Sequence, residues 1–125
     1  MTDIFRLEPS PKPKKVTPLE ADSLREVIMA LKTHNLVAWC ERQNTGAAKV
    51  GGRFIKFGWK GCSDILGQLK DGRLLAVECK RLKGGKLTDE QIFFLERVRQ
   101  HGGVSFVATS LHDVLENLGG NHGGY

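Results

Sequence analysis

Several features that are absent from the sequence narrow the classes of protein to which the chain can belong. The N-terminus has no apolar run of the kind found in signal peptides, and no segment approaches the roughly 20 apolar residues that span a bilayer. The cysteines, Cys40, Cys62 and Cys79, are odd in number and form no CxxC pair. Neither a disulfide framework nor a structural zinc site is indicated. We therefore expect a soluble protein of a reducing cytoplasm, with no membrane partner.

Acidic residues are also absent from one long segment. The chain has 19 lysines and arginines against 14 aspartates and glutamates, a formal charge of +5, yet residues 42–61 contain no acidic residue at all. This glycine-rich segment predicts a mobile basic loop or a loose hairpin, and its charge attracts polyanions. The candidate contacts to nucleic-acid phosphates are Asn44, Lys49, Arg53, Lys56 and Lys60. A solvated loop face is the alternative interpretation.

Two tryptophans lie near the basic segment, Trp39 before it and Trp59 within it. Either indole could stack on an exposed base. A tryptophan in a strand is more often part of the core, so we expect Trp39 to be buried.

The length of the chain and its distribution of prolines and glycines predict one compact domain with one core. Residues 1–16, rich in proline and lysine, should form a flexible arm, and the glycine-rich residues 120–125 a disordered tail. The folded domain should therefore span residues 17–119.

Local patterns predict alternating helices and strands. Capping boxes, in which Glu20 and Gln91 occupy the third helical position, start helices at residues 17 and 88. Strand-forming runs cover residues 37–40, 64–69, 74–80 and 104–109. A short helix should end near residue 119. The helix before the last strand would be the crossover that brings this strand alongside the sheet. The order predicts an α/β sandwich.

Glu78 and Lys80 are the first candidates for chemistry. They lie two residues apart in a predicted strand, so both side chains leave the same face. A carboxylate and an ammonium in an apolar strand are costly to bury unless they contact a metal, a ligand or each other. A simple salt bridge at a strand end is the alternative.

Asp64 begins the strand that should pair with the strand of Glu78, and two adjacent carboxylates would repel each other without a cation. Oxygen ligands of this kind suit Mg²⁺ or Mn²⁺. A two-residue turn at Asp71 and Gly72 would pair Asp64 with Cys79 and direct it away from Glu78. We therefore predict a three-residue turn or a bulge, with Gly67 as one candidate position, that shifts the pairing by one residue.

Together these residues resemble the PD-(D/E)xK nuclease superfamily. The segments that carry the resemblance are residues 61–65 (GCSDI), 77–80 (VECK) and 87–91 (LTDEQ), with Ser63 at the position of the proline in the superfamily name. More closely, they resemble the stand-alone VRR-NUC domain of phage and bacterial proteins. The similarity covers residues 20–109. It implies a restriction-endonuclease-like α-β-β-β-α-β core, with a mixed sheet flanked by helices, in a bacterium or in the host cytoplasm of a phage.

The resemblance also implies roles for the candidate residues. Asp64, Glu78 and the backbone carbonyl of Cys79 would hold one or two Mg²⁺ or Mn²⁺ ions, and Lys80 would orient or help deprotonate the attacking water. Gln91 could position Lys80, water or a phosphate. Glu20 could be a further metal-side carboxylate. For Gln91 and Glu20, helix capping is the alternative.

The implied function is hydrolysis of DNA phosphodiester bonds, with branched DNA such as a four-way Holliday junction as the substrate. Coordinated cutting of two strands would need a homodimer, for which the segment Phe54-Ile55-Lys56-Phe57 and the final helix are candidate interfaces. The alternatives are a nuclease-like module that binds DNA without cutting it, and a flap- or end-processing nuclease.

Overall fold

The computed structural model describes residues 18–43, 46–80 and 85–119. Its centre is a mixed four-stranded sheet with the order β1-β4-β5-β6. The strands are β1 (Val37–Arg42), β4 (Ile65–Leu69), β5 (Leu74–Cys79) and β6 (Val104–Ala108). Neighbouring strands are antiparallel except β5 and β6, which run parallel because helix α2 (Asp89–Gln100) returns the chain between them.

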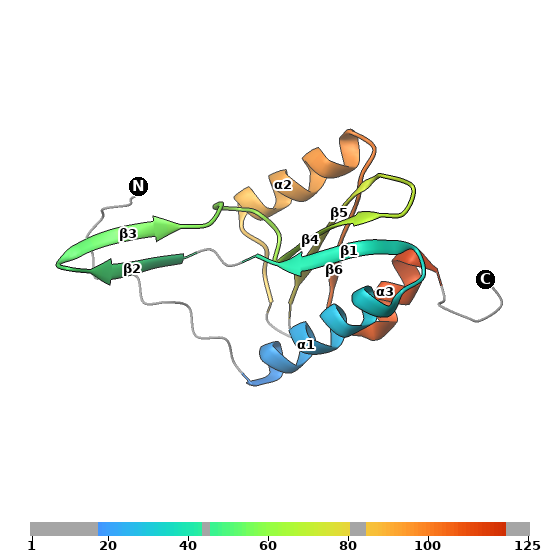
Figure 1. Cartoon of the computed structure of the whole chain (residues 1–125), viewed down its shortest axis with the longest axis horizontal. Coiled ribbons are helices and arrows are strands. Elements are labelled where there is room, and N and C mark those ends of the chain that lie inside the picture. The colour runs from blue at the N-terminus through green and yellow to red at the C-terminus, as the bar shows by residue number, and fades with distance from the viewer. Residues whose placement is uncertain (1–17, 44–45, 81–84, 120–125) are drawn as a thin grey trace.

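Helices cover both faces of this sheet. Helices α1 (Pro18–Thr33) and α3 (Leu111–Leu118) lie on one face, and α2 lies on the other (Figure 1). The chain is thus an α/β protein with a mixed sheet flanked by helices, as expected. The predicted arm and tail lie outside the described residues. Within the described ranges, no helix is long and apolar enough to cross a membrane.

The two faces of the sheet bury different amounts of apolar surface. Leu75, Val77 and Cys79 of β5 point into the larger core, which lies under α1 and α3. Ala76, between them in sequence, belongs to a smaller core under α2. The alternation of side chains along a strand therefore directs Glu78 to the α2 face.

Helix α2 packs on β5 and β6 and leaves the β1 side of its face uncovered. Trp39 of β1 is 49% exposed there, and its indole N–H donates to Oε1 of Gln68 at 3.0 Å. The prediction that Trp39 is buried was wrong. The pairing of β1 with β4 shifts between Val37 and Trp39, so the simple alternation of faces along β1 is interrupted at this bulge.

The basic segment folds as a hairpin, which was one of the two predicted possibilities. Strands β2 (Gly46–Val50) and β3 (Arg53–Phe57) form a separate two-stranded sheet that projects from the body of the molecule (Figure 1). Gly51 and Gly52 connect them with φ angles of 58° and 82°. Two consecutive positive φ angles are the geometry of a tight type I′ turn, which glycine adopts without steric cost.

Candidate active site

The turn between β4 and β5 sets which of their residues face each other. The N–H of Leu69 donates to the carbonyl of Arg73 at 2.8 Å, so the turn contains three residues, 70–72, and Gly72 adopts a φ of 99°. Ile65 then lies opposite Val77. One step further along, Asp64 meets Glu78, as the predicted shift of one residue requires. The shift comes from the turn and not from Gly67, which lies in regular β4–β5 pairing.

Asp64 and Glu78 face each other, and the carboxylate of each also accepts a hydrogen bond from a backbone N–H of the opposite segment. Glu78 is 1% exposed, and its Oε1 accepts from the N–H of Asp64 at 3.3 Å. Oδ2 of Asp64 accepts from the N–H of Cys79 at 2.8 Å. The carbonyl of Asp64 accepts from the N–H of Gln43, just beyond β1, at 2.7 Å. These contacts fix the start of β4 against its neighbours on both sides.

Two further predicted residues contact the same carboxylate. Nζ of Lys80 lies 3.4 Å from Oε2 of Glu78, and the Lys80 side chain is also largely buried. Nε2 of Gln91, at the start of α2, donates to Oε2 of Glu78 at 2.8 Å. The structure therefore brings Asp64, Glu78, Lys80 and Gln91 together on the α2 face.

Gln91 completes the predicted capping box and also reaches into the site, where it contacts Glu78, whereas its predicted role toward Lys80, water or a phosphate stays a prediction. Its Oε1 accepts from the N–H of Thr88 at 2.9 Å, and its own N–H donates to Oγ1 of Thr88 at 3.1 Å, which completes the capping box. Because the carbonyl end of the amide is used by the cap, its NH₂ group is directed at Glu78. The capping box thus holds the side chain that reaches into the site.

Burial and charge make Glu78 an unusual carboxyl group. Burial raises the pKa of Glu78 most, the charge of Asp64 and a hydrogen bond with it raise the pKa further, and Lys80 lowers it in part, so that it lies at about 8. One ammonium does not fully compensate two carboxylates at this position. A divalent cation would favour the ionised forms of both.

The donor set matches a hard cation. Asp64 and Glu78 supply carboxylate oxygens, and the C=O of Cys79 should lie on the side of Asp64, because the N–H of Cys79 points to that side and both groups of an extended residue point the same way. Magnesium typically binds one or two carboxylates and keeps several waters. In residues 18–43, 46–80 and 85–119, no cluster of three or more His, Cys, Asp or Glu side chains is placed to hold a metal.

Two other residues bear on the donor set. Glu20 lies in the first turn of α1, but its side chain lies outside the described residues. Cys62 is buried near the site. Burial raises the pKa of its thiol most, the charges of Glu78 and Asp64 also raise it, and hydrogen bonds with Ser63 lower it in part. A protonated thiol is a poor metal ligand, so a cation at this position would be held by oxygen atoms.

The predicted phosphate contacts do not share one surface. Residues directly opposite in β2 and β3 share a face, which places Lys49 and Lys56 on one face of the ribbon and Arg53 on the other. All three are exposed. Lys60 lies outside the ribbon, with Nζ at 3.6 Å from Oε2 of Glu90 on α2. Asn44 lies outside the described residues.

Ser63 is a positioning residue that sequence reasoning did not single out. It is buried, and its Oγ donates to the carbonyl of Ile65 at 2.7 Å, which fixes the chain on both sides of Asp64. The signal was available, because serine beside a strand end often bonds to nearby backbone.

Comparisons with known proteins identify no relative for this arrangement. No family model matches the chain, no curated protein matches it, and no solved structure matches it.

Proposed function

We propose that the chain is a divalent-metal-dependent endonuclease that hydrolyses DNA phosphodiester bonds, with a restriction-endonuclease-like core of the PD-(D/E)xK superfamily and motifs of the VRR-NUC type. One observation carries the proposal. Asp64 is opposite Glu78, and the ammonium of Lys80 and the amide of Gln91 contact the same Glu78 carboxylate oxygen. Two carboxylates that can hold a cation and a lysine that can act on the attacking water thus lie together, and metal-dependent hydrolysis of phosphodiesters depends on such a set.

Each side chain has a distinct task in the proposed reaction. Asp64 and Glu78 would hold Mg²⁺ or Mn²⁺, which when bound would supply positive charge to polarise the scissile phosphate and lower the pKa of water. Lys80 orients the attacking water and offsets the negative charge that develops on the phosphate. Gln91 holds the Glu78 carboxylate in one orientation. The cap at Thr88 in turn holds Gln91, so the set is organised before substrate arrives.

A binding module without nuclease activity is the second candidate, and the buried pair of carboxyl groups argues against it. Glu78 is almost fully buried beside Asp64, with a pKa raised to about 8. This arrangement costs folding free energy, and carboxylates repel the phosphates of DNA. A protein that only binds DNA gains nothing from it. A metal-binding site explains why the pair is present.

The proposed substrate is branched DNA, including four-way junctions, and the proposed assembly is a homodimer. Two symmetry-related copies would present two active sites to the two strands that must be cut. The ribbon offers a surface for a second copy, since one of its faces exposes Ala48, Val50 and Ile55. An isolated two-stranded ribbon is only marginally stable, so contact with a partner copy would stabilise it.

A cleavage assay tests the proposal. Labelled linear, flap and four-way-junction DNA are incubated with the purified protein and Mg²⁺, Mn²⁺ or a chelator. We expect cutting with a divalent ion, no cutting with the chelator, and a loss of at least about a hundredfold in rate for Lys80→Ala. Preference for the flap over the junction would identify the end-processing alternative.

Lys32→Ala is the matched control. Lys32 is an exposed lysine of α1, on the opposite face of the sheet. Its loss should leave the cleavage rate unchanged. Junction binding without cutting under every metal would contradict the nuclease proposal and support the binding module.

A further inference from the structure

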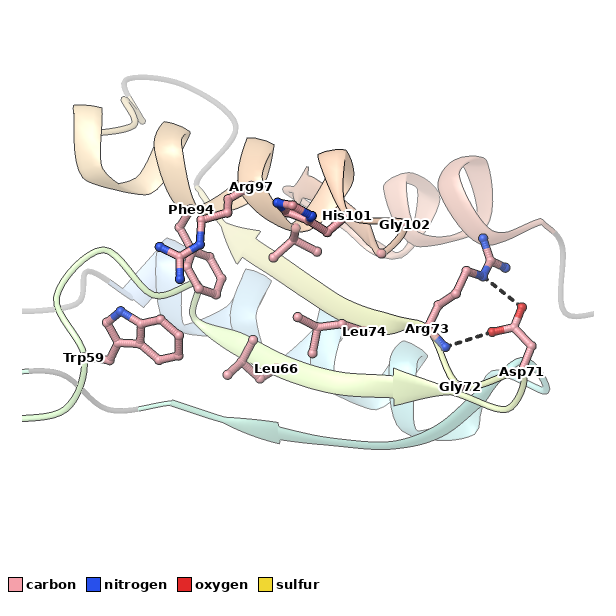
Figure 2. A pocket seen from close by; sticks show the side chains of 12 residues that line it. Trp59, Leu66, Asp71, Gly72, Arg73, Leu74, Phe94, Arg97, His101 and Gly102 are labelled. Carbon is pink, nitrogen blue, oxygen red and sulfur yellow. Dashed lines mark hydrogen bonds and ion pairs between the residues drawn. The ribbon is translucent and has the colours of Figure 1, made fainter.

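A groove lies between α2 and the β4–β5 hairpin, outside the four residues of the proposed active site. Its volume is about 690 Å³, which is within the range of ligand-binding clefts. Figure 2 shows Trp59 and Phe94 at one end, Asp71 and Arg73 at the other, and Leu66 and Leu74 between them. The groove exists because α2 does not cover the β4 side of the sheet.

The aromatic end of the groove presents a partly exposed indole. Trp59 packs edge-on against Phe94, with ring centroids 5.0 Å apart and an angle of 83° between the rings. About half of the surface of Trp59, 51%, remains exposed. The indole is thus held by Phe94 while a large part of it stays accessible. Rings held in this way are typical stacking platforms for unpaired bases.

The charges of the groove suit a polyanion. Asp71 and Arg73 neutralise each other, since Nε of Arg73 lies 2.8 Å from Oδ2 of Asp71. The other charged side chain in the lining is Arg97, and His101, the C-cap residue of α2, follows it four positions later. Arg97 also lies over the ring of Phe93 at 5.8 Å. The net charge is positive, and the floor is apolar.

The groove lies further along α2 than the proposed active site, since Phe94, which lines it, follows Gln91 by three positions. Gln91, which contacts Glu78, and His101 are ten positions apart, which corresponds to about 15 Å along the helix axis. A strand that leaves the active site along α2 would first meet Trp59 and Phe94 and then Arg97 and His101.

We propose that this groove binds an unpaired single strand of DNA, with a base stacked on Trp59 and phosphates contacted by Arg97 and His101. The choice of DNA rests on the proposed nuclease function. The choice of an unpaired strand rests on the lining, since stacked bases in a duplex cannot present their faces to an indole and an apolar floor. The groove would select substrates in which a strand is unpaired beside the cleavage point.

Tryptophan fluorescence tests the proposal directly. The chain has two tryptophans, so Trp39→Phe leaves Trp59 as the single reporter. In the presence of chelator, which prevents metal-dependent cutting, unlabelled oligothymidine should quench Trp59 in a saturable titration. A double-stranded oligonucleotide of the same length should quench it much less. Oligouridine that quenches equally well at the same concentrations would overturn the assignment to DNA.

Substitution of the cations provides a second, independent measurement. Arg97→Gln combined with His101→Gln should raise the Kd for fluorescein-labelled oligothymidine about tenfold. Arg25→Gln, an exposed arginine on α1, should leave the Kd unchanged. Unchanged affinity in the double variant, together with no quenching of Trp59, would overturn the proposal.

The outcome can be separated from that of the nuclease proposal. Cutting of linear duplex by both the wild type and the Arg97/His101 variant, with no quenching, would overturn the groove alone. Quenching by oligothymidine in a protein that cuts no DNA under any metal would overturn the nuclease and support the groove.

Discussion

At the scale of single residues, the burial of Glu78 beside Asp64 links folding stability to pH. The folded protein holds a proton on Glu78 up to a pH of about 8, whereas the unfolded chain releases it near the ordinary value of 4.5. As the pH rises from 4.5 to 8, the unfolded state therefore loses a proton that the folded state retains. Stability from this group is fully present below pH 4.5 and decreases toward pH 8.

Glu78→Gln should remove this dependence in the metal-free protein. Between pH 5 and pH 8, the wild type should lose at least about 1 kcal/mol of unfolding free energy relative to the variant, since each unit of pKa shift corresponds to about 1.4 kcal/mol. Urea unfolding at both pH values measures the difference. Glu96→Gln, on the exposed face of α2, is the control.

Metal binding should restore stability to the wild type at pH 8 but not to the Glu78→Gln variant. Excess Mn²⁺ should raise the Tm of the wild type at pH 8 and leave the Tm of Glu78→Gln nearly unchanged, because the ion stabilises only the state that binds it. An equal rise in both proteins would mean that the ion binds elsewhere.

At the scale of elements, Gly67 allows two strands to approach each other. A Cβ atom at this position would lie 2.4 Å from the carbonyl oxygen of Trp39 and 2.7 Å from Cβ of Cys40. Gly67→Ala should therefore separate β1 from β4 and lower the unfolding free energy by about 1–3 kcal/mol. Thermal unfolding measures this loss. An unchanged Tm would show that β1 can move without cost.

A contact between two helices should also contribute to stability. Oε2 of Glu26 on α1 accepts from the N–H of Leu111, the first residue of α3, at 2.6 Å. Ser110, at the N-cap position, makes no side-chain capping bond. The carboxylate of Glu26 thus satisfies one free N–H and interacts favourably with the positive end of the helix dipole.

Glu26→Gln should lower the unfolding free energy by about 1 kcal/mol, since a neutral amide accepts more weakly than a carboxylate. Urea unfolding measures the effect, with Glu96→Gln as the control. A loss of the same size in Glu96→Gln would assign the effect to the net charge.

The elements differ in how far the sequence predicted them. The alternation of side chains in a strand was enough to place Glu78 and Lys80 on one face, and the capping box was enough to direct Gln91 inward. To predict which face of the sheet Asp64 is on, the length of the β4–β5 turn must be known. The sequence does not give that length, because a glycine at position 72 fits turns of two or three residues. The composition of the basic segment could not reveal that Lys49 and Arg53 lie on opposite faces, because this depends on the pairing of β2 with β3.

At the scale of the whole molecule, the basic charge should appear in the salt dependence of DNA binding. Lys56→Ala combined with Lys60→Ala should weaken the binding of all DNA sequences. It should also flatten the slope of log K against log salt by about 1.8, if each lysine neutralises one phosphate. Titrations at several salt concentrations measure the slope. Arg25→Ala with Lys32→Ala removes the same charge from α1. An equal change in slope there would indicate that net charge alone governs binding.

The turn at residues 70–72 also determines which insertions and deletions the chain can accept. Exposed hairpin tips usually tolerate changes in length. This tip lies about five strand residues, or about 17 Å, from Asp64. A change in tip length that shifts the β4–β5 pairing by one residue would nevertheless move Asp64 to the other face of the sheet, whereas a shift of two residues would preserve its facing. Natural variants with an intact site should therefore keep glycine or asparagine at position 72, where φ is 99°, and should keep the β4–β5 pairing in register when the tip changes length.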